Sequence, residues 1–412
     1  MSEAQPIPSS RAVFWLAVAT TLAMFPLIWM GGLVTSKGAG MSVPDWPNTF
    51  GYNMWAVPWG QWVGEHAGGV FYEHAHRLLG TVVGFLALLT FYASFGFGGT
   101  RARRPLRRIG VGCLLVAVAA YAGPTIVAMT PTGAQRVSHL IGVFGGLGVA
   151  ALAATFFRRP DPRAWVRWLS ATLLGFVIVQ GVLGGLRVVL VSTELAMVHG
   201  VFAQITLCLG GCVALATSRW WASAERSPVR GATWPTAILF LVCLAQLGVA
   251  AVMRHSEAGL AVPDFPLHFG EVLPPTDAAS LEAANDVRRY DYSPPLAPVT
   301  LAQVWLHVAH RIGAAAVSVA SLFVAWRLWR IAKGRVLIVL VLIGVQVTLG
   351  ILTVWLAKPA DLATLHVATG ALLLLAVALT LASVARQRAA LPVLRRSAAA
   401  VPAPSPATVV PA

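Results

Sequence analysis

The chain has 412 residues, of which 57% are hydrophobic and only 11% are charged. A soluble domain carries about 25% charged residues, so the low charge and the mean hydropathy of +0.74 exclude an ordinary soluble protein and indicate an integral membrane protein. The net charge of +15 does not indicate a nucleic-acid partner, because the basic residues gather in alternate loops between apolar segments, as in membrane proteins that obey the positive-inside rule.

Ten apolar stretches are each long enough to cross a lipid bilayer, which takes about 20 residues. They lie at 13–33, 74–96, 108–128, 137–157, 166–186, 196–218, 234–254, 304–326, 336–357 and 362–385. Basic residues follow every even-numbered stretch, which places both termini in the cytoplasm and the loops 33–72 and 255–303 outside. We therefore predict an all-α membrane protein with about ten transmembrane helices.

The segments outside the ten stretches are expected to carry no chemistry of their own. We predict a cytoplasmic tail at 1–12, a cytoplasmic linker at 219–233 and a disordered, Pro/Ala-rich cytoplasmic tail at 386–412. The four cysteines all fall inside predicted spans, so we expect no disulfide outside the cell.

Three sequence motifs occur twice in the same order. AGMSVPDWPNTFG at 39–51 returns as AGLAVPDFPLHFG at 258–270, and HAHRLLG at 74–80 returns as VAHRIGA at 308–314. The segment from Gln180 to His199 returns as the segment from Gln346 to His366. Such ordered matches indicate tandem-duplicated four-helix bundles. We assign an N-terminal unit to 13–218, which includes an extra helical hairpin at 108–157, and a C-terminal unit to 234–385.

Five histidines lie in the first turns of the even-numbered stretches, and hence at a similar depth near the outer surface: His76, His139, His199, His310 and His366. An ionisable residue within a span is costly and marks a functional site. Two imidazoles in an apolar four-helix bundle suit a heme, which supplies the other four iron ligands itself, better than zinc with its four ligands. The spacing leaves open whether His139 or His199 is the partner of His76.

Charged residues beside these histidines differ between the two units. Arg77 and Arg311 directly follow their histidines and are candidates to bind heme propionates. Glu73 precedes His76 by three residues and shares its helix face, whereas the second unit has His307 at the matching position. A carboxylate there can transfer a proton or stabilise a cationic intermediate. The asymmetry suggests that the first unit carries out chemistry and the second holds a cofactor.

With these motifs the chain resembles the heme A synthase family from about residue 13 to 385. GAGMSVPDWP at 38–47 is similar to the family's outer-loop signature, and the segment from Glu73 to Arg77 matches its Glu-x-x-His-Arg motif. Many members carry a cysteine pair flanking the PDWP motif. Val43 and Thr49 stand there in this chain, which is similar to the subtype without outer-loop cysteine pairs.

The resemblance implies an oxidoreductase of the bacterial cell (inner) membrane that oxidises the C8 methyl of heme O to a formyl group for terminal oxidase assembly. It implies a heme b cofactor whose iron is bound by His310 and His366, with Arg311 nearby. The substrate heme O would face His76 and His199, with Arg77 and His139 as further candidates, and Glu73 would be catalytic.

The expected partners are an electron donor, heme O synthase and terminal oxidase assembly factors. Two other functions fit the paired histidines: a bis-histidine membrane cytochrome b for electron transfer, and a heme-handling or transport protein. Glu73 favours the enzyme, because electron transfer alone needs no carboxylate specific to one unit.

Overall fold

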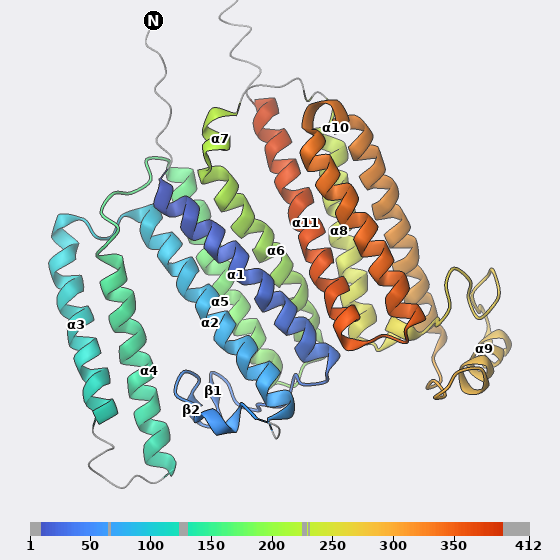
Figure 1. Cartoon of the computed structure of the whole chain (residues 1–412), viewed down its shortest axis with the longest axis horizontal. Helices are drawn as coiled ribbons and strands as arrows, with labels where there is room; N and C mark the ends of the chain where they lie inside the picture. The colour runs from blue at the N-terminus through green and yellow to red at the C-terminus, as the bar shows by residue number, and fades with distance from the viewer. Residues whose placement is uncertain (1–9, 65–66, 123–130, 225–228, 230, 390–412) are drawn as a thin grey trace, which may run out of the picture.

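The structure is a computed structural model that describes residues 10–64, 67–122, 131–224, 229 and 231–389. These residues form a bundle of long helices with one small β-hairpin, as Figure 1 shows. Within the described part of the chain, eight helices are long and apolar enough to cross a membrane. The predicted all-α membrane fold is therefore confirmed.

The helices follow the apolar stretches in order. The first half contains α1 (Arg11–Ser36), α2 (Gly68–Phe95), α3 (Thr100–Ala122), α4 (Pro131–Ala154), α5 (Ala164–Val189), α6 (Thr193–Thr217) and the short α7 (Arg219–Ser223). The second half contains α8 (Thr233–His255), α9 (Ala278–Tyr290), α10 (Leu301–Trp355) and α11 (Ala360–Ala389). Strands β1 (Asn48–Thr49) and β2 (Tyr52–Asn53) pair antiparallel in the loop after α1, and single 3-10 turns lie at Trp59–Gln61 and Ala258–Leu260.

The difference between ten predicted spans and eight helices has two causes. With 55 residues, α10 would be about 80 Å long if straight, far more than the ~30 Å of a bilayer core. It breaks at Ala332, whose φ of −140° and ψ of 42° are not helical, and its two arms run side by side in opposite directions (Figure 1). The arms are the predicted spans 304–326 and 336–357. The third predicted span forms α3, which begins with a run of arginines and is not among the eight apolar helices; residues 123–128 lie outside the described part.

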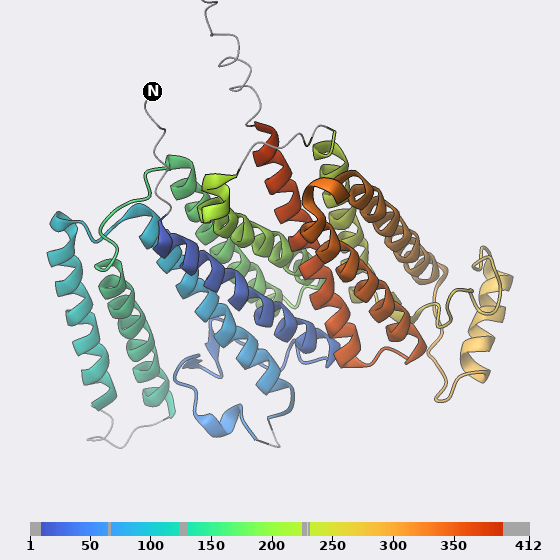
Figure 2. The same ribbon diagram turned by 45° about the horizontal axis from the view of Figure 1, so that its top comes forward.

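Two helical bundles stand side by side in both views (Figures 1 and 2). Helices α1, α2, α5 and α6 pack together around a core that includes Ala17, Leu173 and Leu207. Helix α8, the arms of α10 and α11 pack around Leu239 and Leu328. Helices α1 and α6 of the first bundle contact α8 and α11 of the second. The α3–α4 hairpin stands outside the first bundle and contacts it mainly through α4 (Figure 1).

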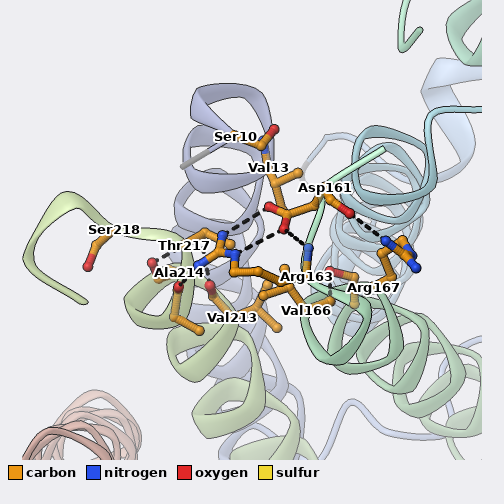
Figure 3. Close-up of polar contacts among 12 residues, drawn as sticks. Ser10, Val13, Asp161, Arg163, Val166, Arg167, Val213, Ala214, Thr217 and Ser218 are labelled. Carbon is orange, nitrogen blue, oxygen red and sulfur yellow. Dashed lines mark hydrogen bonds and ion pairs between the residues drawn. The ribbon is translucent and has the colours of Figure 1, made fainter. Parts of the chain in front are cut away.

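The two ends of the bundle differ in chemistry. We call the end with residues 37–64 and 256–300 the loop end, and the opposite end, where α1 starts and α11 finishes, the basic end (Figure 1). At the basic end the fully buried Asp161 accepts from Arg163 Nε at 3.0 Å and Nη2 at 2.9 Å. Arg163 also donates to the carbonyl of Ala216 at 2.9 Å, and the Asp161 amide donates to Ser94. This charge pair, shown in Figure 3, joins the ends of α2, α5 and α6.

Candidate functional site

Two pairs of histidines lie near the loop end, and within each pair the two imidazole rings lie close together. His76 of α2 and His199 of α6 have ring centroids 6.4 Å apart and ring planes 78° apart. His310 of α10 and His366 of α11 have centroids 6.4 Å apart and planes 67° apart. The duplicated sequence thus produces the same pair twice, once in each bundle.

The spacing within each pair suits one metal ion between two imidazoles. With metal–nitrogen bonds of about 2 Å and a ring radius of about 1 Å, two rings on opposite sides of one ion have centroids about 6 Å apart. Within the described residues, no cluster of three or more His, Cys, Asp or Glu side chains is placed to hold a metal. A metal at either pair would therefore take its remaining ligands from a bound group, as heme iron does.

Glycines make room for three of the four rings. A Cβ added at Gly31 would lie 2.9 Å from Cε1 of His76, and one at Gly184 would lie 2.8 Å from Cε1 of His199. In the second unit, a Cβ at Gly350 would lie 3.1 Å from Cε1 of His366. A side chain at any of these positions would crowd the ring, so glycine leaves the space that the imidazole occupies.

All four histidines line one cavity of about 780 Å³ that extends across both bundles. Apolar side chains such as Leu27, Ile28, Leu247 and Ile343 form much of its wall. Small-molecule and cofactor sites are typically apolar cavities of about 300–1,000 Å³ with a few placed polar groups. The cavity is therefore suited to a large, mostly apolar ligand.

Arg77 and Arg311 line this cavity, but their guanidinium groups also hold the repeated loops. Arg77 donates to the carbonyls of Asp45 at 2.6 Å, Asn48 at 2.7 Å and Val43 at 2.8 Å. Arg311 donates to the matching loop, to the carbonyls of Val262 and Leu267 at 3.0 Å each and to that of Asp264. The loop-holding role was not expected from the sequence.

The repeated loops have the same internal structure. The carboxylate of Asp45 accepts from the amides of Phe50 at 2.9 Å and Gly51 at 2.8 Å. The carboxylate of Asp264 accepts in the same way from Phe269 and Gly270, both at 2.9 Å. In both loops the phenylalanine and the glycine have positive φ. Each PDWP-like segment is thus a rigid cover at the loop end of its own bundle.

Glu73 is buried, with 4% of its surface exposed, and lines the cavity. One carboxylate oxygen forms an ion pair with Arg77 at 2.9 Å, and the other accepts from the amide of Val43 at 3.0 Å. In the second unit, Nδ1 of His307 lies 3.4 Å from the amide of Val262 and 3.2 Å from the carbonyl of Ala258. The two side chains thus occupy equivalent places, and only the first unit has a carboxylate there.

His139 lies apart from both ring pairs. Its Nε2 is 3.0 Å from the carbonyl of Gly51, and it is not among the residues that line the cavity. Nearby on α4, Gln135 donates to the carbonyl of Phe50, and the amide of Asn53 donates to Ser138. The geometry therefore favours His199 as the partner of His76, and His139 contacts the loop of the first unit.

Three further polar residues line the cavity. Arg187 donates to the carbonyl of Gly40, and Arg254 donates to the carbonyl of Gly32 and to Ser36, while both line the cavity. Gln246 contacts His310. Gln246 was missed by the sequence reasoning, and its signal is a polar residue in the middle of an apolar span. The four cysteines are free thiols in α3, α6 and α8.

The fold and the site define a class: helical membrane proteins with two homologous bundles, each of which presents a histidine pair to a shared cavity. Residues 139–379 match the family model described as Cytochrome oxidase assembly protein. The chain is 33% identical over 267 residues to a heme A synthase of Caulobacter sp. (strain K31), covering 60% of this chain and 70% of that relative. It is 32% identical over 200 residues to a heme A synthase of Beijerinckia indica subsp. indica, covering 45% of this chain and 50% of that relative. The chain belongs to the heme A synthase family of cytochrome oxidase assembly proteins.

Proposed function

We propose that the protein is a heme A synthase, which oxidises the C8 methyl of heme O to a formyl group. The observation that carries the proposal is that each bundle presents one histidine pair to the same cavity. In both pairs the two ring centroids are 6.4 Å apart. One pair can retain a cofactor while the other receives the substrate. A single cavity lets the two groups lie close enough to exchange electrons.

His310 and His366 would hold the cofactor, heme b. When bound, this heme supplies one-electron redox chemistry. The chain contributes the two axial imidazoles and the loop held by Arg311, which covers that end of the bundle. The contacts behind the two rings keep their orientation fixed.

His76 and His199 would bind the substrate heme O, and Glu73 would act on the methyl group. Oxidation of a methyl to a formyl group with water as the source of the oxygen atom passes electrons to an external oxidant and releases protons, so a proton acceptor is needed in the cavity. Glu73 is the carboxylate that lines the cavity in the first unit. Glu73 forms an ion pair with Arg77, and a carboxylate in this place can accept a proton or stabilise positive charge on the substrate.

Arg187 and Arg254 are the best candidates to bind the propionates of the two hemes. Each lines the cavity at the loop end and donates to backbone carbonyls of the first unit through Nη2. Charge-assisted hydrogen bonds from arginine to carboxylate are among the stronger ones in proteins. In the bacterial inner membrane, the loop end would face outward and both termini the cytoplasm, as the basic loops require.

The experiment that tests the function is extraction of pigments from a host that makes this protein, with and without a source of heme O. The expected result is a formyl heme, identified by its mass and its pyridine hemochrome spectrum, only when heme O is supplied. A protein that carries heme but yields no formyl heme would support a bis-histidine electron-transfer cytochrome instead. Heme O synthase and terminal oxidase assembly factors are the partners expected to supply the substrate and to receive the product.

A further inference from the structure

Helix α4 presents one polar face to the first repeated loop. The residues on that face follow the spacing i, i+3, i+4 and i+7 of one side of a helix, and they are Gln135, Ser138, His139 and Gly142. The α3–α4 hairpin leaves the first bundle and returns to it at one point of the basic end, where the amide of Gly98 donates to the carbonyl of Phe157 at 2.6 Å. The face on α4 is a second attachment, at the loop end.

Three hydrogen bonds join this polar face to the tip of the loop, residues 50–53. Each side chain meets a backbone group of a different tip residue: Gln135 the carbonyl of Phe50 at 2.9 Å, His139 that of Gly51 at 3.0 Å, and Ser138 the amide of Asn53 at 2.8 Å. The fourth position is a glycine, and a Cβ at Gly142 would overlap the side-chain amide of Asn53. All four positions of the face therefore dock the loop tip on α4.

The two repeated loops have equivalent tips that lie differently. In the register of the repeat, the antiparallel pair of Thr49 and Tyr52 matches the bridge between His268 and Glu271. Continued by two residues, the same register matches Met54 with Leu273. Met54 lines the cavity, whereas Leu273 is 77% exposed. The backbone of the tip is thus the same in both units, but only the first unit turns the following side chain toward the cavity.

Docking on α4 accompanies this difference. A Cβ at Gly51 would overlap the amide of Gln135, whereas a Cβ at Gly270 would meet no atom of the described chain within 4 Å beyond its chain neighbours. Helix α9 holds the second loop nearer its start instead, where Arg288 donates to a backbone carbonyl at 2.7 Å. The first loop is thus fixed at its tip, next to Met54, and the second at its start.

The first loop covers the part of the cavity where the proposed oxidation takes place. It contributes Trp46, Pro47 and Met54 to the cavity wall, near Glu73. Oxidation of a methyl to a formyl group takes two steps of two electrons each. The first step takes an oxygen atom from water, forms a hydroxymethyl group and releases two protons, and the second removes two electrons and two protons from that alcohol. The electrons pass to the external oxidant, so the alcohol must stay bound between the steps.

We propose that the α3–α4 hairpin is a clamp on the substrate unit. Gln135, Ser138 and His139 are positioning residues that hold the loop tip on α4, and with it Met54 against the cavity, so that the partly oxidised heme is retained until the second step. The inference rests on the proposed function and deepens it. The second unit, which would keep its heme throughout, has no such hairpin: its equivalent helices are the two arms of α10, which join directly at Ala332.

The position of the loop can be measured without activity. In the purified full-length protein with its four cysteines replaced, Met54→Cys should react slowly with a water-soluble maleimide and Leu273→Cys should react fast. Gly142→Leu places a side chain against Asn53 and should speed the reaction of Met54→Cys about tenfold, because each hydrogen bond lost from the docked tip changes the equilibrium by about 2–10-fold. Gly146→Leu is the matched control, since a Cβ at Gly146 would meet no atom of the described chain within 4 Å.

The pigments made in a host that supplies heme O test retention. Gly142→Leu should raise the ratio of hydroxymethyl heme to formyl heme about tenfold, by the same shift in docking, and Gly146→Leu should leave the ratio unchanged. Gln135→Leu with His139→Phe removes two of the three hydrogen bonds without adding a side chain at Gly142, and it should reproduce both effects. The heme b spectrum should be the same in all of these variants, because the second unit is not altered.

The outcomes separate the inference from the function. Slow labelling of Met54→Cys in both Gly142→Leu and the Gln135→Leu, His139→Phe variant would overturn the clamp. Faster labelling with an unchanged ratio of the two hemes would overturn its role in retention and leave the proposed function standing. An unaltered chain that makes neither heme from heme O would overturn the proposed function and retention together, and the labelling would still decide whether α4 holds the loop.

Discussion

Glu73 and His307 do the same structural task with different chemistry. Each lies one helical turn before a histidine of one of the two pairs, and each lies beside the amide of the equivalent valine, Val43 or Val262. What differs is charge: Glu73 is an anion paired with Arg77 at 2.9 Å. In the second unit a histidine contacts the same part of the loop through Nδ1, which lies 3.2 Å from the carbonyl of Ala258.

Glu73→Gln separates the two roles of this side chain. The amide oxygen can still accept from the amide of Val43. The negative charge that could take up a proton or stabilise a cation is lost. We expect heme A to fall by about 10²–10⁴-fold, the typical contribution of a general acid or base, with the heme b spectrum unchanged. Pigment analysis by chromatography at equal protein expression measures this. Glu73→His, which copies the second unit, should behave the same way, and near-normal heme A in both variants would reduce Glu73 to a loop anchor.

The proposed ligand histidines of the second unit have a direct spectroscopic test. His310→Ala and His366→Ala should each abolish or strongly alter the low-spin heme b spectrum of the purified protein, because each removes one axial imidazole. His268→Ala is the matched control, since Nδ1 of His268 contacts the carbonyl of Val272 in the loop before α9 and does not line the cavity. An unchanged spectrum in both ligand variants would refute the cofactor site.

Much of the candidate site was accessible from the sequence because it is duplicated. The repeat predicted that His76, His199, His310 and His366 lie at one depth, and the structure brings them together as two pairs. The contacts of Arg77 and Arg311 were not accessible, because their acceptors are backbone carbonyls, which leave no trace in residue identity. His139 was included because it also lies in the first turn of a span. It does not join either histidine pair, since the hairpin that carries it stands outside the bundle.

At the scale of elements, helix positions followed from hydropathy and helix ends from local chemistry. The break in α10 at Ala332 lies in a basic segment between two apolar runs, as the predicted loop between the eighth and ninth spans required. Helix α9 was missed, because the search was for long apolar stretches and α9 is short and polar. Its signal was the capping box of Asp277 and Ser280 at its start.

The charge pair at the basic end holds three helices together. Asp161→Ala would leave Arg163 buried without its carboxylate, and breaking a buried pair on one side costs about 3–5 kcal/mol. We expect a clearly lower midpoint of thermal unfolding in detergent. Asp286→Ala is the control, because Asp286 and Arg289 are 3.6 Å apart and more than half exposed, and such pairs contribute about 0–1 kcal/mol. Equal midpoints for the two variants would contradict a structural role for Asp161.

At the scale of the whole molecule, the two bundles share contacts as well as a cavity. Arg254 of the second bundle donates to the carbonyl of Gly32 and to Ser36 at 2.8 Å each, and Ser36 lies 3.1 Å from the hydroxyl of Thr364 in α11. These contacts lie at the loop end, beside the cavity. The loop end therefore joins the two units where the proposed chemistry needs them close together.

The orientation of the chain in the membrane decides which compartment reaches this end. The start of α1 and the end of α11 lie together at the basic end (Figure 1), where the arginine-rich segments after α2, α4 and α10's first arm also lie. Retention of basic residues in the cytoplasm predicts that α9 lies outside. In a chain whose four cysteines are replaced, a cysteine at Ala283 of α9 should react with a membrane-impermeant maleimide in intact spheroplasts. A cysteine at Phe156, exposed at the basic end, should react only after permeabilisation. The reverse pattern would invert the topology and place the histidine pairs near the cytoplasm.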